Sequence, residues 1–259
     1  MSSAILTDMD EQIRKHVMEQ LERKRAQINE QLDAHRQRIN QRFDQKTAEL
    51  NGKLNFKQEQ IISAALELLA SGGLNEMSLR DIAKKLDIKA PALYWYFKNK
   101  SDLVDYMAEA ILRREFSEAK PRAENETWQD WLTRHMTKLR KAMLAYPDGG
   151  RVVAGARLDP AKTLAQIFED SVLSLTSAGI SQKTALYTVM TAVQYTFGFV
   201  IEEQAGPKPK DIATFVDSDF SDAYPNLASA VKEYRKGVDI EDKAYAAGLQ
   251  LIIKGAEAK

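Results

Sequence analysis

Apolar residues recur every three or four positions along most of the chain, which is the period of a helix with one buried face. The pattern is clear in residues 128–144 and 165–179. No stretch shows the strict alternation of apolar and polar residues that is typical of a half-buried strand. Segments that mix Pro, Gly, Asp or Asn separate the periodic stretches, as helix ends and caps do. We therefore predict an all-α protein.

The front of the chain carries a narrower pattern, in which apolar residues are spaced alternately by four and seven positions. An eleven-residue repeat of this kind predicts a long helix in a straight or slightly right-handed coiled coil. A stripe this narrow fits one partner helix rather than a globular core, although a single solvated helix is the alternative. The seam positions are Val17, Leu21, Ile28, Leu32, Ile39, Phe43, Leu50 and Leu54.

Composition divides the chain into three regions, 1–52, 53–101 and 102–259. The middle region holds three short helical patterns, with Ser78 as the expected cap of the second and Pro91 in the first turn of the third, about 90–97. This succession is typical of a helix-turn-helix, whose second helix enters the DNA major groove. Residues 78–101 hold six basic and two acidic side chains, a local net charge of +4 that suits phosphates.

Charge and chemistry narrow the function further. The 37 basic and 37 acidic residues of the whole chain balance, so only a local patch can attract nucleic acid. The chain has no Cys, only three His, and neither a Gly-rich phosphate loop nor a paired-carboxylate motif, so we expect no enzyme, metal site or cofactor. The start lacks the pattern of a signal peptide, and the most apolar stretch, 186–201, falls short of the ~20 residues of a membrane span. We expect a soluble, cytoplasmic protein without a membrane partner.

The stretch LRDIAKKLDIKAPALYWYFKNKSDL, residues 79–103, resembles the DNA-binding head of TetR-family repressors, whose recognition helix reads LYxHFxxKxxL or LYWHVKNK. The resemblance implies that Arg80 is the best candidate to read a guanine, and that Leu93 and Phe97 lie in the core. Where tetracycline repressors have Gln and Thr, this chain has Ala90 and Ala92, so we expect a different operator sequence. The implied DNA contacts are Ser78, Arg80, Lys89, Ala90, Pro91, Ala92, Tyr94, Trp95, Tyr96, Lys98 and Lys100.

Beyond the head, the stretches RKAMLAYPDGGRVVAG and ALYTVMTAVQYTFGFVIEEQAG are similar to the ligand-binding and dimerisation domain of the tetracycline-repressor branch. The resemblance implies a homodimer held by a four-helix bundle. That branch chelates a magnesium–drug complex with a His, which is Val153 here, near a Thr that is Ala156. Another drug-binding His is Phe116, an Asn is His135, and a Gln is approximately Ser171. These changes favour a more apolar, metal-free pocket.

The pocket is expected among Phe116, Trp131, His135, Leu139, Val153, Ala156, Phe168, Ser171, Gln194 and Glu202. The leading hypothesis is a ligand-responsive dimeric repressor that binds a palindromic double-stranded operator and is released by a small, largely apolar inducer other than magnesium-tetracycline. One alternative is an interaction or architectural protein whose coiled coil recruits a partner. Another is a DNA-binding protein that has lost induction. Because the two heads of a dimer sit apart, we expect the coiled coil to join the subunits in antiparallel fashion.

Overall fold

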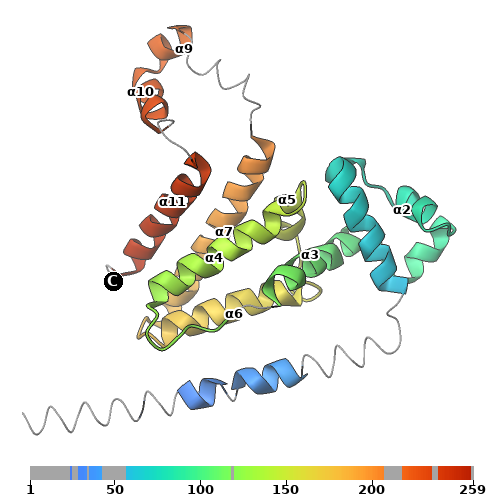
Figure 1. Cartoon of the computed structure of the whole chain (residues 1–259), viewed down its shortest axis with the longest axis horizontal. Coiled ribbons are helices and arrows are strands. Elements are labelled where there is room, and N and C mark those ends of the chain that lie inside the picture. The colour runs from blue at the N-terminus through green and yellow to red at the C-terminus, as the bar shows by residue number, and fades with distance from the viewer. Residues whose placement is uncertain are drawn as a thin grey trace, which may run out of the picture. The chain divides into compact units, whose positions relative to one another are not determined.

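The computed structural model describes residues 24, 29–33, 35–42, 57–117, 120–206, 218–234 and 239–257 (Figure 1). The chain divides into two compact units, Met1–Glu59 and Gln60–Lys259. Within the described ranges the regular elements are helices and none is a strand, so the all-α prediction is confirmed. The boundaries at 52 and 101 stay a prediction.

The first unit contains a described helix over residues 29–33 and 35–42. Leu32 and Ile39 lie seven residues apart and so share one face of it, as the eleven-residue repeat requires. The remaining seam positions lie outside the described residues: Val17, Leu21, Ile28, Phe43, Leu50 and Leu54. The pairing of this helix with another stays a prediction.

The second unit begins with a three-helix head. A helix over 57–76 is followed by α2 (Leu79–Lys85) and by η1 (Ala90–Trp95), a 3₁₀ helix at the position of the third predicted helix. Ser78 caps α2 as predicted, because its Oγ accepts the N–H of Asp81 at 3.2 Å. The apolar stripes of the three elements meet in one small core: Ile61, Ala65, Leu69, Ile82, Leu93 and Phe97.

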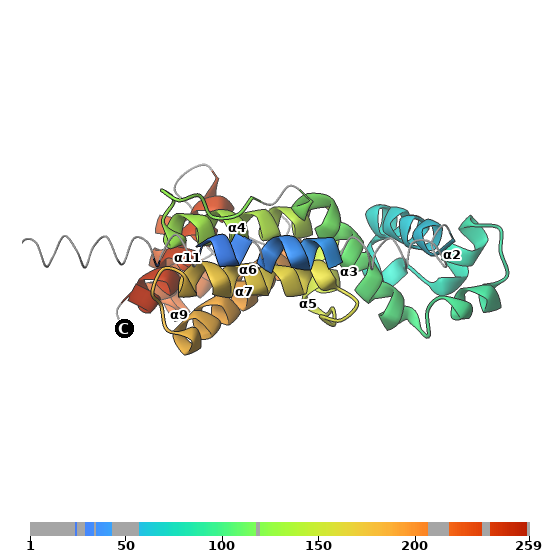
Figure 2. The same ribbon diagram turned by 90° about the horizontal axis from the view of Figure 1, so that it is seen from below.

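A larger helical bundle follows the head and contains the rest of the apolar core (Figures 1 and 2). Helix α7 is its centre, because it packs against α4, α5, α6 and α11. Helices α9 and α10 pack on each other. The elements are α3 (Lys100–Phe116), α4 (Trp128–Leu144), α5 (Gly149–Ala154), α6 (Lys162–Thr176), α7 (Gln182–Ala205), α9 (Ser218–Ala223), α10 (Pro225–Tyr234) and α11 (Ile240–Glu257).

Local capping and close packing explain these elements. Asn99, Thr127 and Ser181 each accept the N–H three residues ahead and so begin α3, α4 and α7. Gly248 of α11 faces Tyr195 of α7, and a Cβ there would come within 2.9 Å of the Tyr195 ring and still closer to its hydroxyl oxygen. The two helices can therefore pack closely only because residue 248 has no side chain.

Helix α7 is long and apolar enough to cross a membrane, with a mean hydropathy of 1.3, and no other helix of the described ranges meets that test. Its most buried face consists of small and β-branched residues that pack on neighbouring helices: Ala185, Val189, Ala192, Val193 and Val200. A central core helix has the same composition as a membrane span. We therefore describe α7 as the core of the bundle.

Candidate functional site: a DNA-facing head joined to a ligand-binding bundle

The 3₁₀ helix η1 divides its side chains between the core and the solvent. Leu93 and Phe97 are 0% and 1% exposed, which confirms the prediction that they are core residues. Tyr94 and Trp95 are 58% and 87% exposed, so neither side chain belongs to the core of the head. Tyr96 is partly buried. The head thus presents two large aromatic side chains to the solvent from the element expected to enter the groove.

The basic residues of the head differ in how free they are. The side chains of Arg80, Lys89 and Lys98 are exposed, as is Pro91. Lys100 instead donates its Nζ to the carbonyl oxygen of Leu74 at 2.8 Å. An ammonium group has three donors, so this bond leaves two for a phosphate. Ala90 and Ala92, at the start of η1, are partly buried together with the cap Ser78.

The last turn of the first helix of the head is held by α5. Asp148, the N-cap residue of α5, has a φ of +57° and accepts the N–H of Leu74 with its Oδ2 at 2.8 Å. Gly73 has a φ of +76°, and a Cβ there would come within 2.8 Å of the same Oδ2. Arg151 bonds Asn75 Oδ1 at 3.4 Å. These contacts fix the head to the helix that carries Val153.

A second link joins the segment after α5 to α3. Arg157 donates its backbone N–H and its Nε to the buried carboxylate of Asp105 at 2.9 and 2.7 Å. Its Nη2 also bonds Asp102 at 2.8 Å. The hydrogen bond and charge of Asp105, with those of Asp102, raise the pKa of the Arg157 guanidinium. The segment that follows α5 is therefore bonded to α3, the helix that leads directly from the head.

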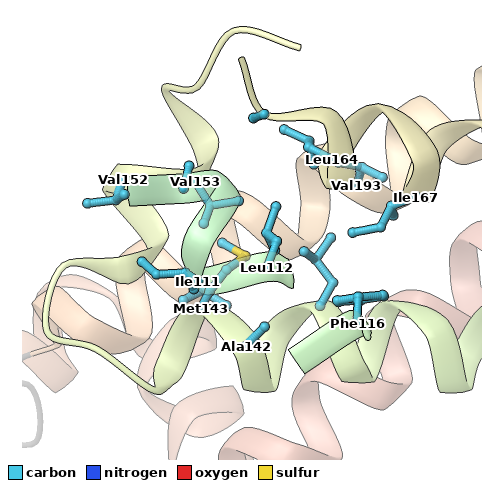
Figure 3. Packing of buried hydrophobic residues seen from close by; sticks show 14 of the residues in the cluster. Ile111, Leu112, Phe116, Ala142, Met143, Val152, Val153, Leu164, Ile167 and Val193 are labelled. Carbon is cyan, nitrogen blue, oxygen red and sulfur yellow. The ribbon is translucent and has the colours of Figure 1, made fainter. Parts of the chain in front are cut away.

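The predicted ligand residues of α3 and α4 form one aromatic group. The rings of Trp131 and His135 are stacked with centroids 4.4 Å apart, and Phe116 meets His135 edge-on at 5.3 Å. Lys138 Nζ lies 5.4 Å from the Phe116 centroid. In Figure 3 the Phe116 side chain lies close to Ile167 of α6 in the buried cluster. These three side chains form a buried aromatic cluster at the end of α3.

The other predicted ligand residues are divided between this interior and the surface. Leu139, Val153 and Ser171 are buried, and Ala156 and Phe168 are partly buried against the core. Gln194 and Glu202, however, are exposed on α7. The opposite face of α7 is the one that packs inside the bundle, so within one chain these two residues do not join the aromatic group.

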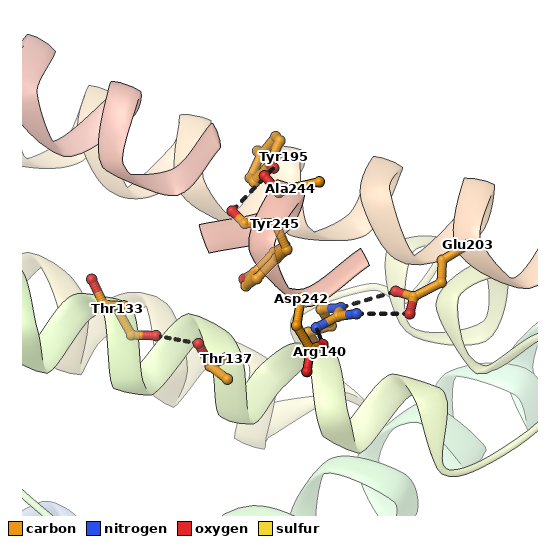
Figure 4. Close-up of polar contacts among 8 residues, drawn as sticks. All are labelled: Thr133, Thr137, Arg140, Tyr195, Glu203, Asp242, Ala244 and Tyr245. Carbon is orange, nitrogen blue, oxygen red and sulfur yellow. Dashed lines mark hydrogen bonds and ion pairs between the residues drawn. The ribbon is translucent and has the colours of Figure 1, made fainter. Parts of the chain in front are cut away.

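Arg140 is a buried charged residue that the sequence interpretation missed (Figure 4). Its guanidinium binds both carboxylate oxygens of Glu203 at 2.9 and 2.7 Å and bonds Asp242 Oδ1, which joins α4 to α7 and α11. It also lies 5.0 Å from the ring centroid of Tyr245. Burial lowers the pKa of the guanidinium, but the bonds to Glu203 and Asp242 outweigh burial, so the pKa is raised. One signal was available, because Arg140 falls within the apolar stripe of its helix.

Tyr245 completes this network. Its hydroxyl shares a 2.8 Å hydrogen bond with Thr196 Oγ1, and its ring stacks on Tyr195 at a centroid distance of 5.5 Å. Burial raises the pKa of the Tyr245 hydroxyl. Tyr195 Oη in turn donates to the backbone carbonyls at the start of α11 (Figure 4). The last helix is thereby held against α7 by polar and aromatic contacts together.

Comparison with known proteins identifies the family. Residues 61–107 match the family of bacterial regulatory proteins of the tetR type, and residues 120–259 match the tetracyclin repressor-like C-terminal domain. The chain is also 35% identical over 206 residues to a tetracycline repressor protein class C of Escherichia coli, across 78% of this chain and 90% of that protein. The chain belongs to the TetR family. The eleven-residue repeat at the front of the chain lies outside both matched ranges.

Solved structures agree with this membership. A possible TetR-family transcriptional regulator of Streptomyces coelicolor is 29% identical, with a TM-score of 0.68 over 78% of this chain and 98% of that one. TetR of Acinetobacter baumannii is 31% identical, with a TM-score of 0.58 over 78% and 96%. This TetR-family chain therefore has the fold of a ligand-responsive DNA-binding repressor. Proteins of the family are transcription regulators that bind operator DNA and small molecules and dimerise.

In the part of the chain that the structure describes, no three His, Cys, Asp or Glu side chains are grouped so that they could hold a metal ion. Val153 and Ala156 stand at the positions where the resemblance to tetracycline repressors implied metal-binding His and a nearby Thr. Neither side chain offers an oxygen or nitrogen ligand to a hard cation.

Proposed function

We propose that this TetR-family protein is a homodimeric transcriptional repressor that binds a two-fold symmetric operator and is released by a small, largely apolar inducer without magnesium. The main observation in support is the exposed aromatic pair Tyr94 and Trp95, flanked by exposed cations on a well-packed head. An isolated Trp with 87% of its surface in water is expected where a macromolecular partner covers it. On DNA, Trp95 would contact backbone or thymine methyl groups while Arg80 reads a guanine.

Dimerisation would bury the exposed face of α7 and α11. Leu186, Tyr187 and Met190 of α7 are 44%, 55% and 40% exposed, and Leu251 of α11 is 72% exposed. Four large apolar side chains on two adjacent helices form a patch that suits a second copy in a two-fold interface. In such a dimer Gln194 and Glu202, which lie on exposed positions of α7, would be available to the partner subunit. The two heads would then occupy major grooves about 34–36 Å apart.

The proposed inducer site is the aromatic group of Phe116, Trp131 and His135. It also includes Val153 of α5 and Ala156 of the segment that follows α5. An inducer that displaces α5 and the segment after it would act on the head through two contacts. One is the bond from the Leu74 N–H to Asp148, and the other is the bond from Arg157 to Asp105 of α3. The ligand needs differential affinity for the two head arrangements to shift their populations. A largely apolar lining without metal ligands favours an uncharged or weakly polar compound.

A gel-shift experiment with DNA flanking the chain's own gene tests the DNA-binding part of this proposal. Arg80→Ala is expected to weaken operator binding by about 1–3 kcal/mol, the value of one bidentate base contact. Lys141→Ala, which removes an exposed cation of α4, is the matched control and should leave affinity unchanged. Equal losses in both variants, or no specific complex, would contradict the proposal. Compounds from a screened library that release the protein from the operator should do so equally well with and without a magnesium chelator.

A second function, recruitment of a partner by the coiled coil, is favoured by one observation. The family matches begin at residue 61, and the eleven-residue repeat lies before it. Deletion of residues 1–51 should abolish partner capture if this is the function, and should leave operator recognition intact if the repressor proposal holds. Cysteines at Leu21 and Leu50 test the proposed antiparallel pairing, because they should cross-link to each other. Cross-links between two copies of position 21 would indicate parallel packing instead.

A further inference from the structure

Three polar side-chain atoms are buried without a hydrogen-bond partner at one end of the bundle. They are Arg122 Nε, Trp131 Nε1 and Ser174 Oγ, and no described residue pairs with them. The Trp131 and Ser174 side chains are 2% and 5% exposed. Arg122 is held in place by its other nitrogens, since Nη1 donates to the Glu126 carbonyl at 3.0 Å and Nη2 to Ser177 Oγ at 3.1 Å. Its Nε has no hydrogen-bond partner among the described residues.

These atoms belong to residues at the same end of the α4–α6 pair. Arg122 joins the start of α4 to the end of α6, and the two helices pack side by side with opposite directions (Figure 1). Trp131 lies four residues after the cap Thr127, and Ser174 lies three residues before Ser177. At about 1.5 Å per residue, both are within about 6 Å along the axis from the end that Arg122 closes. The Trp131 ring stacks on His135 at this same level.

The missing partner must be a hydrogen-bond acceptor. An indole N–H and a guanidinium Nε–H can only donate, whereas a serine hydroxyl can donate or accept. Each buried polar group left without a partner costs about 1–3 kcal/mol, and native proteins contain few of them. Two of the three atoms are obligate donors, so they call for an oxygen acceptor, and one of them belongs to Trp131 of the stacked aromatic group.

We propose that these three atoms are the polar subsite for the inducer, and that the inducer is a flat, largely apolar molecule bearing a carbonyl or carboxylate oxygen. This inference rests on the proposed ligand-responsive function. The planar part lies against Phe116 and His135, and its oxygen accepts the N–H of Trp131. Because the subsite offers mostly donors, a ligand whose polar group is an amine or ammonium is disfavoured. The subsite thus selects ligands by hydrogen bonding, whereas the rest of the site selects them by shape.

The test uses Prodan, a flat naphthyl ketone without N–H or O–H groups, whose fluorescence reports binding to the full-length protein. Trp131→Phe keeps an aromatic ring and removes the N–H, and is expected to weaken Prodan about two- to tenfold, the value of one hydrogen bond. Trp128→Phe is the matched control, because it makes the same change three residues earlier on the same helix. Its affinity for Prodan should equal that of the wild type. Thermal unfolding of both variants checks that they fold.

A ligand pair isolates the hydrogen bond. Acetylnaphthalene and ethylnaphthalene differ by one carbonyl oxygen, and each is measured by displacement of Prodan. The ratio of the affinities for the ketone and the hydrocarbon should fall about two- to tenfold in Trp131→Phe, which is the value of one hydrogen bond. The same ratio should not change in Trp128→Phe. An unchanged preference in Trp131→Phe would overturn the subsite, and so would the absence of saturable Prodan binding to the wild type. The subsite would also be overturned if Trp131→Phe raised the stability of the protein and left its affinity for Prodan unchanged, because water alone would then occupy the site.

Operator binding is measured separately in the same samples, which keeps the two proposals distinguishable. If the wild type binds operator and Prodan affinity does not depend on Trp131, the subsite is wrong and the repressor function stands. If Trp131→Phe weakens Prodan but no operator complex forms in the wild type, the subsite stands as a ligand site and the repressor function is wrong.

Discussion

Replacing Arg140 should remove one of the largest single contributions to the stability of the bundle. The substitution Arg140→Met keeps the length of the side chain but deletes the two bonds to Glu203 and the bond to Asp242. Breaking a buried ion pair costs about 3–5 kcal/mol, since the remaining charge is left uncompensated. Here the uncompensated charge is Glu203, whose side chain is only 19% exposed, whereas Asp242 is 72% exposed and can be solvated. The expected cost comes almost entirely from Glu203.

Urea unfolding and calorimetry at fixed protomer concentration measure this cost. A loss of about 3–5 kcal/mol corresponds to a fall of about 6–20 °C in the melting temperature of a domain of this size. Arg134→Met is the matched control, because Arg134 pairs with Glu126 at 2.9 Å but is 45% exposed. An exposed pair contributes only about 0–1 kcal/mol.

The double variant Arg140→Met/Glu203→Met sharpens the test. Replacing both members of a buried pair by apolar residues of similar size is often neutral. The double variant should therefore recover most of the stability that Arg140→Met loses. If Arg140→Met costs no more than Arg134→Met, or if the double variant is less stable than the single one, the assignment of the cost to an unpaired Glu203 is wrong.

Two further predictions concern packing and pH. Gly248→Ala should destabilise the protein by about 1–3 kcal/mol because the new Cβ meets the Tyr195 ring, whereas Gly255→Ala, which meets nothing within 4 Å, should not; equal melting temperatures would contradict this packing. Burial raises the pKa of Glu109 above its ordinary value of 4.5, although Thr163 donates two hydrogen bonds to the carboxylate. The folded state therefore holds this proton more tightly than the unfolded state. The stability that Glu109 contributes falls as the pH rises from about 4.5 through the raised pKa. Glu109→Gln should lose this part of the pH dependence in melting curves, and an unchanged pH profile would contradict the assignment.

The helices and the core of the head were predictable because they depend on local signals. Ser78 caps α2, Leu93 and Phe97 are buried, and Pro91 lies in the first turn of η1, all as the spacing predicted. The type of the third helix was not predictable in the same way. Only six residues long, η1 forms a 3₁₀ helix, a state that differs from an α-helix by small changes in backbone angles.

The parts of the site that were missed depend on contacts between distant residues. Arg140 and its partners Glu203 and Asp242 are separated by 63 and 102 residues, and no local pattern pairs them. Gln194 was assigned to the pocket by resemblance and is exposed on a single chain, so its place in a ligand site stays a prediction that depends on the dimer. Which face of α7 is internal was not decided by its sequence, because apolar residues occur on both faces of this helix.

Hydroxyl-radical footprinting of the full-length protein on the DNA that flanks its own gene tests the central proposal most directly. The account predicts two protected segments with centres about 34–36 Å apart, related by two-fold symmetry. Both should disappear when a flat, acceptor-bearing inducer is added, with no requirement for magnesium. A single protected segment, protection that is equal on unrelated DNA, or protection that no such ligand removes would contradict a dimeric, ligand-released repressor.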